Sequence, residues 1–193
     1  MSLDQLKSRV RAIGAVYADR EKRARRLFIE ERSDFLKDQR EIEFSIKTEI
    51  SRHFKISYSD VSFCGSAQLG FSIHQDKLFE PAISDLDVAC INMDLFQQAW
   101  TDALSTTHAF TDLTPFGAMD SKRIDLFKDQ LLRRGMIRID VMPLSDLSRS
   151  WSTFQGQLSR QYTGLFKAIS VAIYMNEYAF CWKQDSVLQN LMR

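Results

Sequence analysis

The chain has 193 residues, enough for one domain with a sizeable core or for one domain with a helical extension. Hydrophobic residues make up 45% and charged residues 26%, as in an ordinary soluble globular protein. The net charge of +1 excludes a strong overall field that would attract a polyanionic partner.

Cysteine usage and the apolar stretches predict a cytoplasmic protein. The three cysteines form no C-x-x-C pair and are odd in number, which argues against a disulfide framework or a zinc site. The N-terminal sequence MSLDQLKSRV lacks the apolar core of a signal peptide. The longest apolar stretch, residues 165–180, is interrupted by Lys167, Asn176 and Glu177, so we expect no membrane partner.

Residues 1–56 are predicted to form an N-terminal helical segment. Residues 3–53 contain one glycine, Gly14, and no proline. Apolar side chains recur at helical spacing first over residues 3–17 and again over residues 35–50. Between them lies an almost entirely charged stretch, so we expect one long helix or two helices with a break. Such a helix could join two copies of the chain or bind a partner subunit.

The pattern then changes to alternating strands and helices. We expect strands at VSFCG (61–65), SDLDVACIN (84–92) and MIRIDVMPL (136–144), helices at 94–106 and 122–134, a loop at 107–120, and helices over 158–192. This order predicts a mixed α/β (α+β) fold in one compact domain. Its catalytic core would span residues 57–148, and residues 149–193 would add C-terminal helices.

Two aspartates, Asp85 and Asp87, stand two residues apart in the second predicted strand. Side chains at positions i and i+2 of a strand point to the same face, so the two carboxylates lie side by side. Two close, half-buried carboxylates repel each other and lose solvation, and a hard divalent cation such as Mg²⁺ removes both costs. A third carboxylate nearby would allow two metal ions, the arrangement used for phosphoryl transfer.

A repeated Arg-Ile-Asp tripeptide offers two candidates for this third acid, Asp125 and Asp140. Asp125 lies in a helical pattern, whereas Asp140 lies in the alternating pattern of the third predicted strand. A metal site formed on adjacent strands therefore requires Asp140.

Gly65 and Ser66 follow the first predicted strand and are candidates for phosphate binding. Gly65 has no side chain, so a phosphate can approach the backbone closely. Ser66 adds a hydroxyl group, and N–H groups at a strand-to-helix turn bind anions. Lys122 and Arg138 are further candidates for neutralising phosphate charge.

These residues resemble the motifs of the DNA polymerase β-like nucleotidyltransferase superfamily. The resemblance covers residues 61–144 and rests on Gly65-Ser66, on Asp85-Leu86-Asp87 and on Asp140. The stretch IDVMPL resembles the third-acid strand of the branch that contains oligoadenylate synthetases, cyclic GMP-AMP synthase and their bacterial relatives. That branch often begins with a long N-terminal helix.

The resemblance implies an enzyme that uses two Mg²⁺ or Mn²⁺ ions, held by Asp85, Asp87 and Asp140. It would transfer a nucleotide from an NTP or dNTP to a hydroxyl group and release pyrophosphate. The product would be an oligonucleotide or a cyclic nucleotide signal for a separate effector protein, as in antiphage defence. Two alternatives stay open: transfer of a nucleotide to a protein or tRNA, and a nucleotide-binding interaction protein without catalysis.

The chain departs from the family pattern in two ways. The segment between Ser66 and Asp85, residues 67–84, is longer than is usual in the family. We expect this segment to cover the site and to place His74, Gln75 and Lys77 near the nucleotide. Only residues 150–193 are available to complete the nucleotide cleft, so a second subunit could close it.

Overall fold

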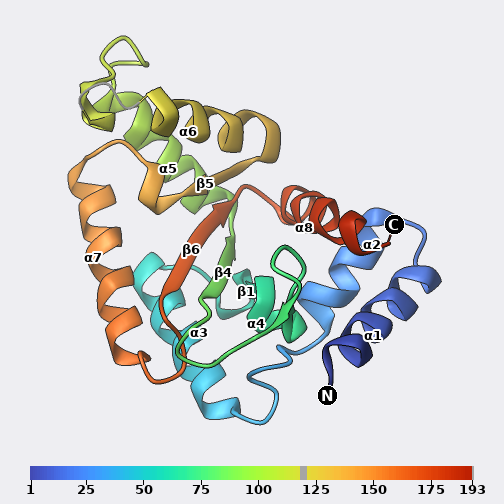
Figure 1. The fold of residues 1–193 in the computed structure, drawn as a ribbon. Coiled ribbons are helices and arrows are strands. Elements are labelled where there is room, and N and C mark those ends of the chain that lie inside the picture. The colour runs from blue at the N-terminus through green and yellow to red at the C-terminus, as the bar shows by residue number, and fades with distance from the viewer. Residues whose placement is uncertain (118–120, 193) are drawn as a thin grey trace.

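A computed structural model describes residues 1–117 and 121–192 and shows a mixed helix-and-sheet fold, as predicted (Figure 1). The end of the predicted loop, residues 118–120, lies outside the described residues. The helices are α1 (Leu3–Val16), α2 (Arg20–Arg25), α3 (Arg40–Phe54), α4 (Gly65–Leu69), α5 (Met93–Thr106), α6 (Ser121–Arg134), α7 (Asp146–Gln161) and α8 (Glu177–Met192). Shorter helical turns are η1 (Arg26–Glu30, a π-helical turn), η2 (Tyr58–Asp60), η3 (Thr114–Phe116) and η4 (Ile139–Val141). None of these elements combines the length and the apolar character needed to cross a bilayer.

Four strands form the central sheet in the order β1-β4-β6-β5. They are β1 (Val61–Cys64), β4 (Leu86–Ile91), β5 (Met136–Arg138) and β6 (Ile169–Tyr174). Strand β4 pairs antiparallel with β1 and parallel with β6, and β5 pairs antiparallel with the far edge of β6. Two further strands, β2 (Phe71–Ser72) and β3 (Lys77–Leu78), form a separate small hairpin.

Strand β6 corrects the prediction that residues 158–192 are all helical. The segment ISVAIY forms a six-residue strand in the middle of the sheet, between α7 and α8. It is rich in β-branched and aromatic residues, which pack well on a pleated surface, and it is too short to establish a helical stripe of its own. The sheet therefore extends beyond the predicted core of residues 57–148.

The N-terminal segment is not one long helix: it is broken in the charged stretch, as the second alternative predicted, but into three pieces, α1, α2 with η1, and α3, and not two. Asp19 begins the second piece by accepting a hydrogen bond from the backbone N–H of Lys22, as an N-cap residue does. The two apolar stripes then serve different cores. Leu6 and Val10 pack on one side of the sheet, whereas Ile46 and Ile50 pack on the other. One straight helix could not reach both sides.

Alternation along the strands gives the sheet two different faces. Leu86 and Val88 of β4 belong to a core covered by α3, α5 and α7. Ala89 of β4 and Tyr174 of β6 belong to the opposite core, which is covered by α1, α2 and α8 (Figure 1). Asp87 lies on this second face, so the elements around α8 decide what surrounds it.

The two ends of the chain meet through an ion pair between α2 and α8. The guanidinium of Arg23 donates to Asp185, with Nε 2.8 Å from Oδ1, and the two residues are only 7% and 1% exposed. Arg20 is half-exposed and approaches the same carboxylate with a Nε–Oδ2 distance of 3.7 Å. Because both residues are buried, removal of either one would leave the charge of the other buried without its partner, which costs stability.

We expect Arg23→Met to lower the free energy of unfolding by about 3–5 kcal/mol, because it leaves the Asp185 carboxylate buried with only the neutral amide of Gln189 and the longer contact to Arg20. Arg20→Met is the matched control and should cost less than about 1 kcal/mol, since Arg20 is half-exposed and its contact with Asp185 is long. Urea unfolding of both variants measures the difference. Equal losses would show that the Arg23 pair does not hold α2 against α8.

Candidate functional site

A cavity of about 960 Å³ opens on the second face of the sheet. Its walls come from the start of α4, the β2–β3 hairpin, the α6–β5 segment and α8. Six of the seven predicted site residues line it: Gly65, Ser66, Asp85, Asp87, Arg138 and Asp140. The seventh, Lys122, is exposed in the first turn of α6 and does not belong to the cavity lining.

The turn from β1 into α4 places backbone directly against Asp87. Cys64 and Asp87 are register partners in the β1–β4 ladder, and Gly65 follows with a φ of +66°. A β-carbon at Gly65 would overlap Oδ2 of Asp87 and would come within 3.1 Å of its Cγ. Position 65 therefore requires glycine both for its left-handed backbone and for the missing side chain. Ser66 follows at the cavity wall.

Asp85 and Asp87 form the predicted carboxylate pair at the beginning of β4. Asp85 is exposed just before the strand, and Asp87 is partly buried within it. Burial raises the pKa of Asp87 from its ordinary value to about 6, and the negative charge of Asp85 adds to this rise. Lys183 and Arg138 act in the opposite direction but do not cancel the rise. The cations Lys183 and Arg138 thus offset the negative charge of Asp85 and Asp87 only in part.

Asp140 is not on a strand next to β4, which corrects the prediction of adjacent strands. Strand β6 lies between β4 and β5, and the chain leaves β5 at Arg138 to form η4, which contains Asp140. The prediction failed because the second neighbour of β4 comes from residues that were expected to be helical. Asp140 is exposed and accepts two hydrogen bonds from Arg138, with Nε 3.0 Å from Oδ1.

Ser170 lies on β6, the strand between β4, which carries Asp87, and β5, which leads into η4 and Asp140. It is the register partner of Asp87 in the β4–β6 ladder. The backbones of β4 and β5 are separated by two strand spacings, or about 10 Å. Ser170 lines the cavity with a small side chain, so it leaves space in the cavity beside Asp87.

Within residues 1–117 and 121–192, no three His, Cys, Asp or Glu side chains converge closely enough to form a ready-made metal site. The donor chemistry of Asp85 and Asp87 nevertheless suits a hard divalent cation, because both offer carboxylate oxygens and their charge is undercompensated. Asp140 could join them only by leaving Arg138.

Five cationic side chains line the same cavity: Lys77, Arg134, Arg138, Lys167 and Lys183. Lys183 of α8 is partly buried, and this burial lowers its pKa. Asp87, Arg134 and Arg138 line the same cavity, and their charges also act on the pKa of Lys183. Sequence reasoning missed Lys183, because nothing in its helical pattern shows which face of α8 turns toward Asp87.

The segment between Ser66 and Asp85 forms one wall of the cavity. It consists of α4, the β2–β3 hairpin and a turn that leads into β4. His74, Gln75 and Lys77 line the cavity, in agreement with the expected position of this segment. Asp76, at the hairpin tip, forms an ion pair with Lys7 of α1, which ties the hairpin to the N-terminal helix.

Gln130 of α6 is a second residue that sequence reasoning did not assign to the site. It lines the cavity, is only 3% exposed, and has no hydrogen-bond partner for Oε1 within the described part of the chain. A buried acceptor without a donor costs about 1–3 kcal/mol. A water molecule or a donor group of a ligand would remove this cost.

Three aromatic residues near the C-terminal helices pack away from the cavity. Trp151 is buried, Phe154 stacks on His53 at a ring separation of 3.8 Å, and the hydroxyl of Tyr162 bonds to Ser45 and Glu49. All three belong to the opposite core, so they do not stack a ligand in the cavity. Burial raises the pKa of Cys64 strongly, which keeps its thiol protonated, as expected for a core cysteine.

The cavity thus combines undercompensated carboxylates, a backbone turn that permits close approach, and surrounding cations. This combination suits a ligand that carries phosphate groups together with a divalent metal ion. Compared with protein-family models, with curated proteins and with solved structures, the chain gives no significant match.

We expect Asp87→Asn to change how stability depends on pH. A raised pKa means that the folded protein holds this proton more tightly than the unfolded chain, so stability falls as pH rises from about 4 to about 6. Without metal, Asp87→Asn should remove up to about 3 kcal/mol of this fall. The measurement is urea unfolding in EDTA between pH 4 and pH 8.

Asp125→Asn is the matched control, since Asp125 ends the other Arg-Ile-Asp tripeptide and is exposed on α6, outside the cavity lining. Its pH profile should follow that of the unmodified protein. Parallel profiles for Asp87→Asn and the unmodified protein would contradict the raised pKa.

Proposed function

We propose that this protein is a metal-dependent nucleotidyltransferase. The observation that carries the proposal is the contact of the Gly65 backbone with the Asp87 carboxylate inside a cavity lined by cations. This contact brings a phosphate-binding turn and a metal-binding carboxylate together, as transfer from a nucleoside triphosphate requires.

The chain would bind the triphosphate through the turn and the cations. Gly65 leaves room for phosphate oxygens at the backbone, and Ser66 offers its hydroxyl group. Lys183 lines the cavity from α8 and can neutralise phosphate charge. Arg134, Lys77 and Lys167 enlarge the positive field around the same space.

Asp85 and Asp87 would hold Mg²⁺ or Mn²⁺. When bound, this metal ion neutralises phosphate charge and lowers the pKa of an attacking hydroxyl group. The residues fit such an ion because their own repulsion is part of what raises the pKa of Asp87. Asp140 would complete the site for a second ion after its release from Arg138.

Arg138 connects phosphate binding to Asp140. Its guanidinium donates to Asp140 in the structure, and a bound phosphate would compete for the same donors. The released Asp140 carboxylate could then accept the proton of the acceptor hydroxyl. The oxygen of the acceptor hydroxyl then forms a bond to the α-phosphorus of the nucleoside triphosphate. The bond between the α-phosphorus and the oxygen that bridges it to the β-phosphorus breaks, and pyrophosphate leaves. Positioning and charge neutralisation would supply most of the rate enhancement.

The proposed product is a free oligonucleotide or cyclic nucleotide that acts as a signal on an effector protein. The cavity has a volume of about 960 Å³, within the range of pockets that hold small-molecule ligands. Transfer to a protein or tRNA would use the same donor site and would differ only in the acceptor.

The test is to incubate the pure protein with Mg²⁺ or Mn²⁺ and each α-³²P-labelled NTP and dNTP. We expect a labelled product and pyrophosphate, and Asp87→Asn should lower the rate at least about 100-fold because it removes a metal-binding charge. Asp125→Asn should retain the rate. Label on a macromolecule from added cell extract would identify the acceptor instead, and nucleotide binding without turnover would contradict catalysis.

Ser170→Val provides a steric test of the same site. Valine should narrow the cavity beside Asp87 and lower the rate at least about 10-fold, whereas Ser170→Ala should keep it. Both substitutions should leave urea unfolding within about 1 kcal/mol of the unmodified protein, since valine favours strands. Full activity of Ser170→Val would show that the reaction does not use this space.

A further inference from the structure

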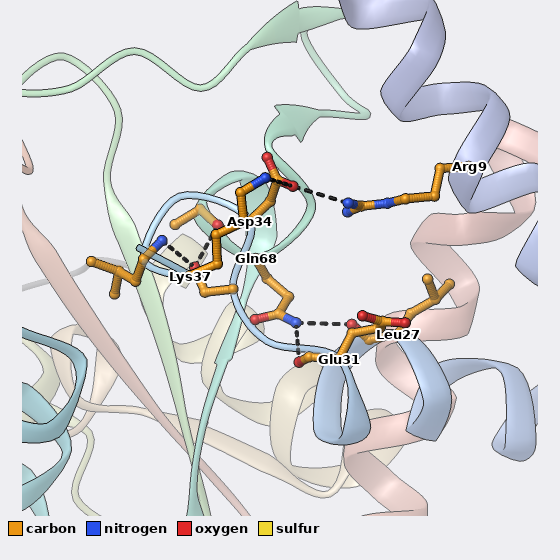
Figure 2. A network of polar contacts seen from close by, with 9 residues as sticks. Arg9, Leu27, Glu31, Asp34, Lys37 and Gln68 are labelled. Atoms are coloured by element: carbon orange, nitrogen blue, oxygen red, sulfur yellow. Dashed lines mark hydrogen bonds and ion pairs between the residues drawn. The ribbon is translucent and has the colours of Figure 1, made fainter. Parts of the chain in front are cut away.

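The short helix α4, which carries Gly65 and Ser66, is bonded to the N-terminal segment through Gln68. This glutamine is 3% exposed, and its Nε2 donates to the backbone carbonyls of Leu27 and Glu31, each at 2.9 Å (Figure 2). Both carbonyls lie at the end of the helical segment α2–η1, where a helix leaves carbonyl groups without donors. One buried amide thus satisfies two such groups.

The N-terminal segment also supplies donors to the end of α4. The backbone N–H of Asp34 donates to the Gln68 carbonyl at 2.9 Å, and the N–H of Phe35 donates to the Ala67 carbonyl at 3.2 Å. The hydroxyl of Ser33 donates to the same Ala67 carbonyl at 2.8 Å. A helix of five residues is too short to be stable alone, so these bonds determine where α4 lies.

Helix α1 reaches this network through Asp34. Arg9 donates to Oδ1 of Asp34 at 3.0 Å, and Lys37 approaches the same oxygen at 3.2 Å (Figure 2). A β-carbon at Gly70, the residue after α4, would come within 3.1 Å of Cγ of Asp34. Asp34 therefore sits between α1 and the end of α4.

We propose that residues 27–37 form a clasp, joined to α4 through Gln68, that sets the position of the Gly65–Ser66 turn and thereby its affinity for nucleotide phosphates. This inference rests on the proposed nucleotidyltransferase function. Gln68 is a positioning residue, because it acts through the turn and does not line the cavity. A partner that engages Arg9 on α1 would act on nucleotide affinity by the same route.

The test compares the KM for the preferred NTP among four single variants. Gln68→Met keeps the side-chain length but removes the donor, and we expect its KM to rise at least 10-fold with kcat changed less than 3-fold. Arg9→Met removes only the bond from α1 to Asp34 of the clasp, and it should raise KM about 3-fold. Because Arg9 is less buried than Gln68, this variant should fold more readily than Gln68→Met.

Two controls separate the clasp from a general loss of stability. Arg11→Met removes a bond from the same helix to the Leu191 carbonyl, which leads to α8 and not to α4. Gln189→Met removes an amide donor to Asp185 on α8. Both should keep KM within 2-fold, even where the melting temperature falls as far as in the clasp variants.

The outcomes distinguish the two proposals. A raised KM in Gln68→Met and Arg9→Met, with unchanged controls, supports the clasp. Unchanged KM in both clasp variants of an active enzyme overturns the clasp and leaves the function standing. Absence of turnover and of ATP binding in the unmodified protein, measured by calorimetry with Mg²⁺, overturns the function and the clasp with it.

Discussion

The close approach of the Gly65 backbone to the carboxylate of Asp87 is the constraint on which the cavity depends. It follows from antiparallel pairing of β1 with β4, which makes Cys64 and Asp87 register partners. The chain must turn away from β1 immediately above a charged side chain, and only glycine permits this turn. The first residues of α4, Gly65 and Ser66, therefore lie against Asp87 at the wall of the cavity.

Around this contact, the protein buries charged groups at a cost to the stability of the fold. Asp87 is placed beside Asp85 in a partly buried position, although its raised pKa shows that this placement is unfavourable for the charged form. Lys183 is likewise partly buried, and this burial lowers its pKa and so disfavours its charged form. Groups held in environments that disfavour their charge are typical of sites where a charged ligand completes the balance.

The remaining architecture holds these groups in place from both ends of the chain. The Arg23–Asp185 pair fixes α2 against α8, which presents Lys183 to the cavity. The network around Gln68 and Asp34 fixes α4, which presents Ser66. The N-terminal segment is thus part of the support of the cavity.

The sequence alone determined the local features: an α/β chain, the turn at Gly65-Ser66, the carboxylate pair, and the helical place of Asp125. These depend on periodicity and residue type within a few positions. Tertiary structure decided that β6 separates β4 from β5, that Asp140 pairs with Arg138, and that Lys183 and Gln130 face the cavity. The physical reason is that strand order and helix facing depend on contacts between distant segments, which local periodicity does not record.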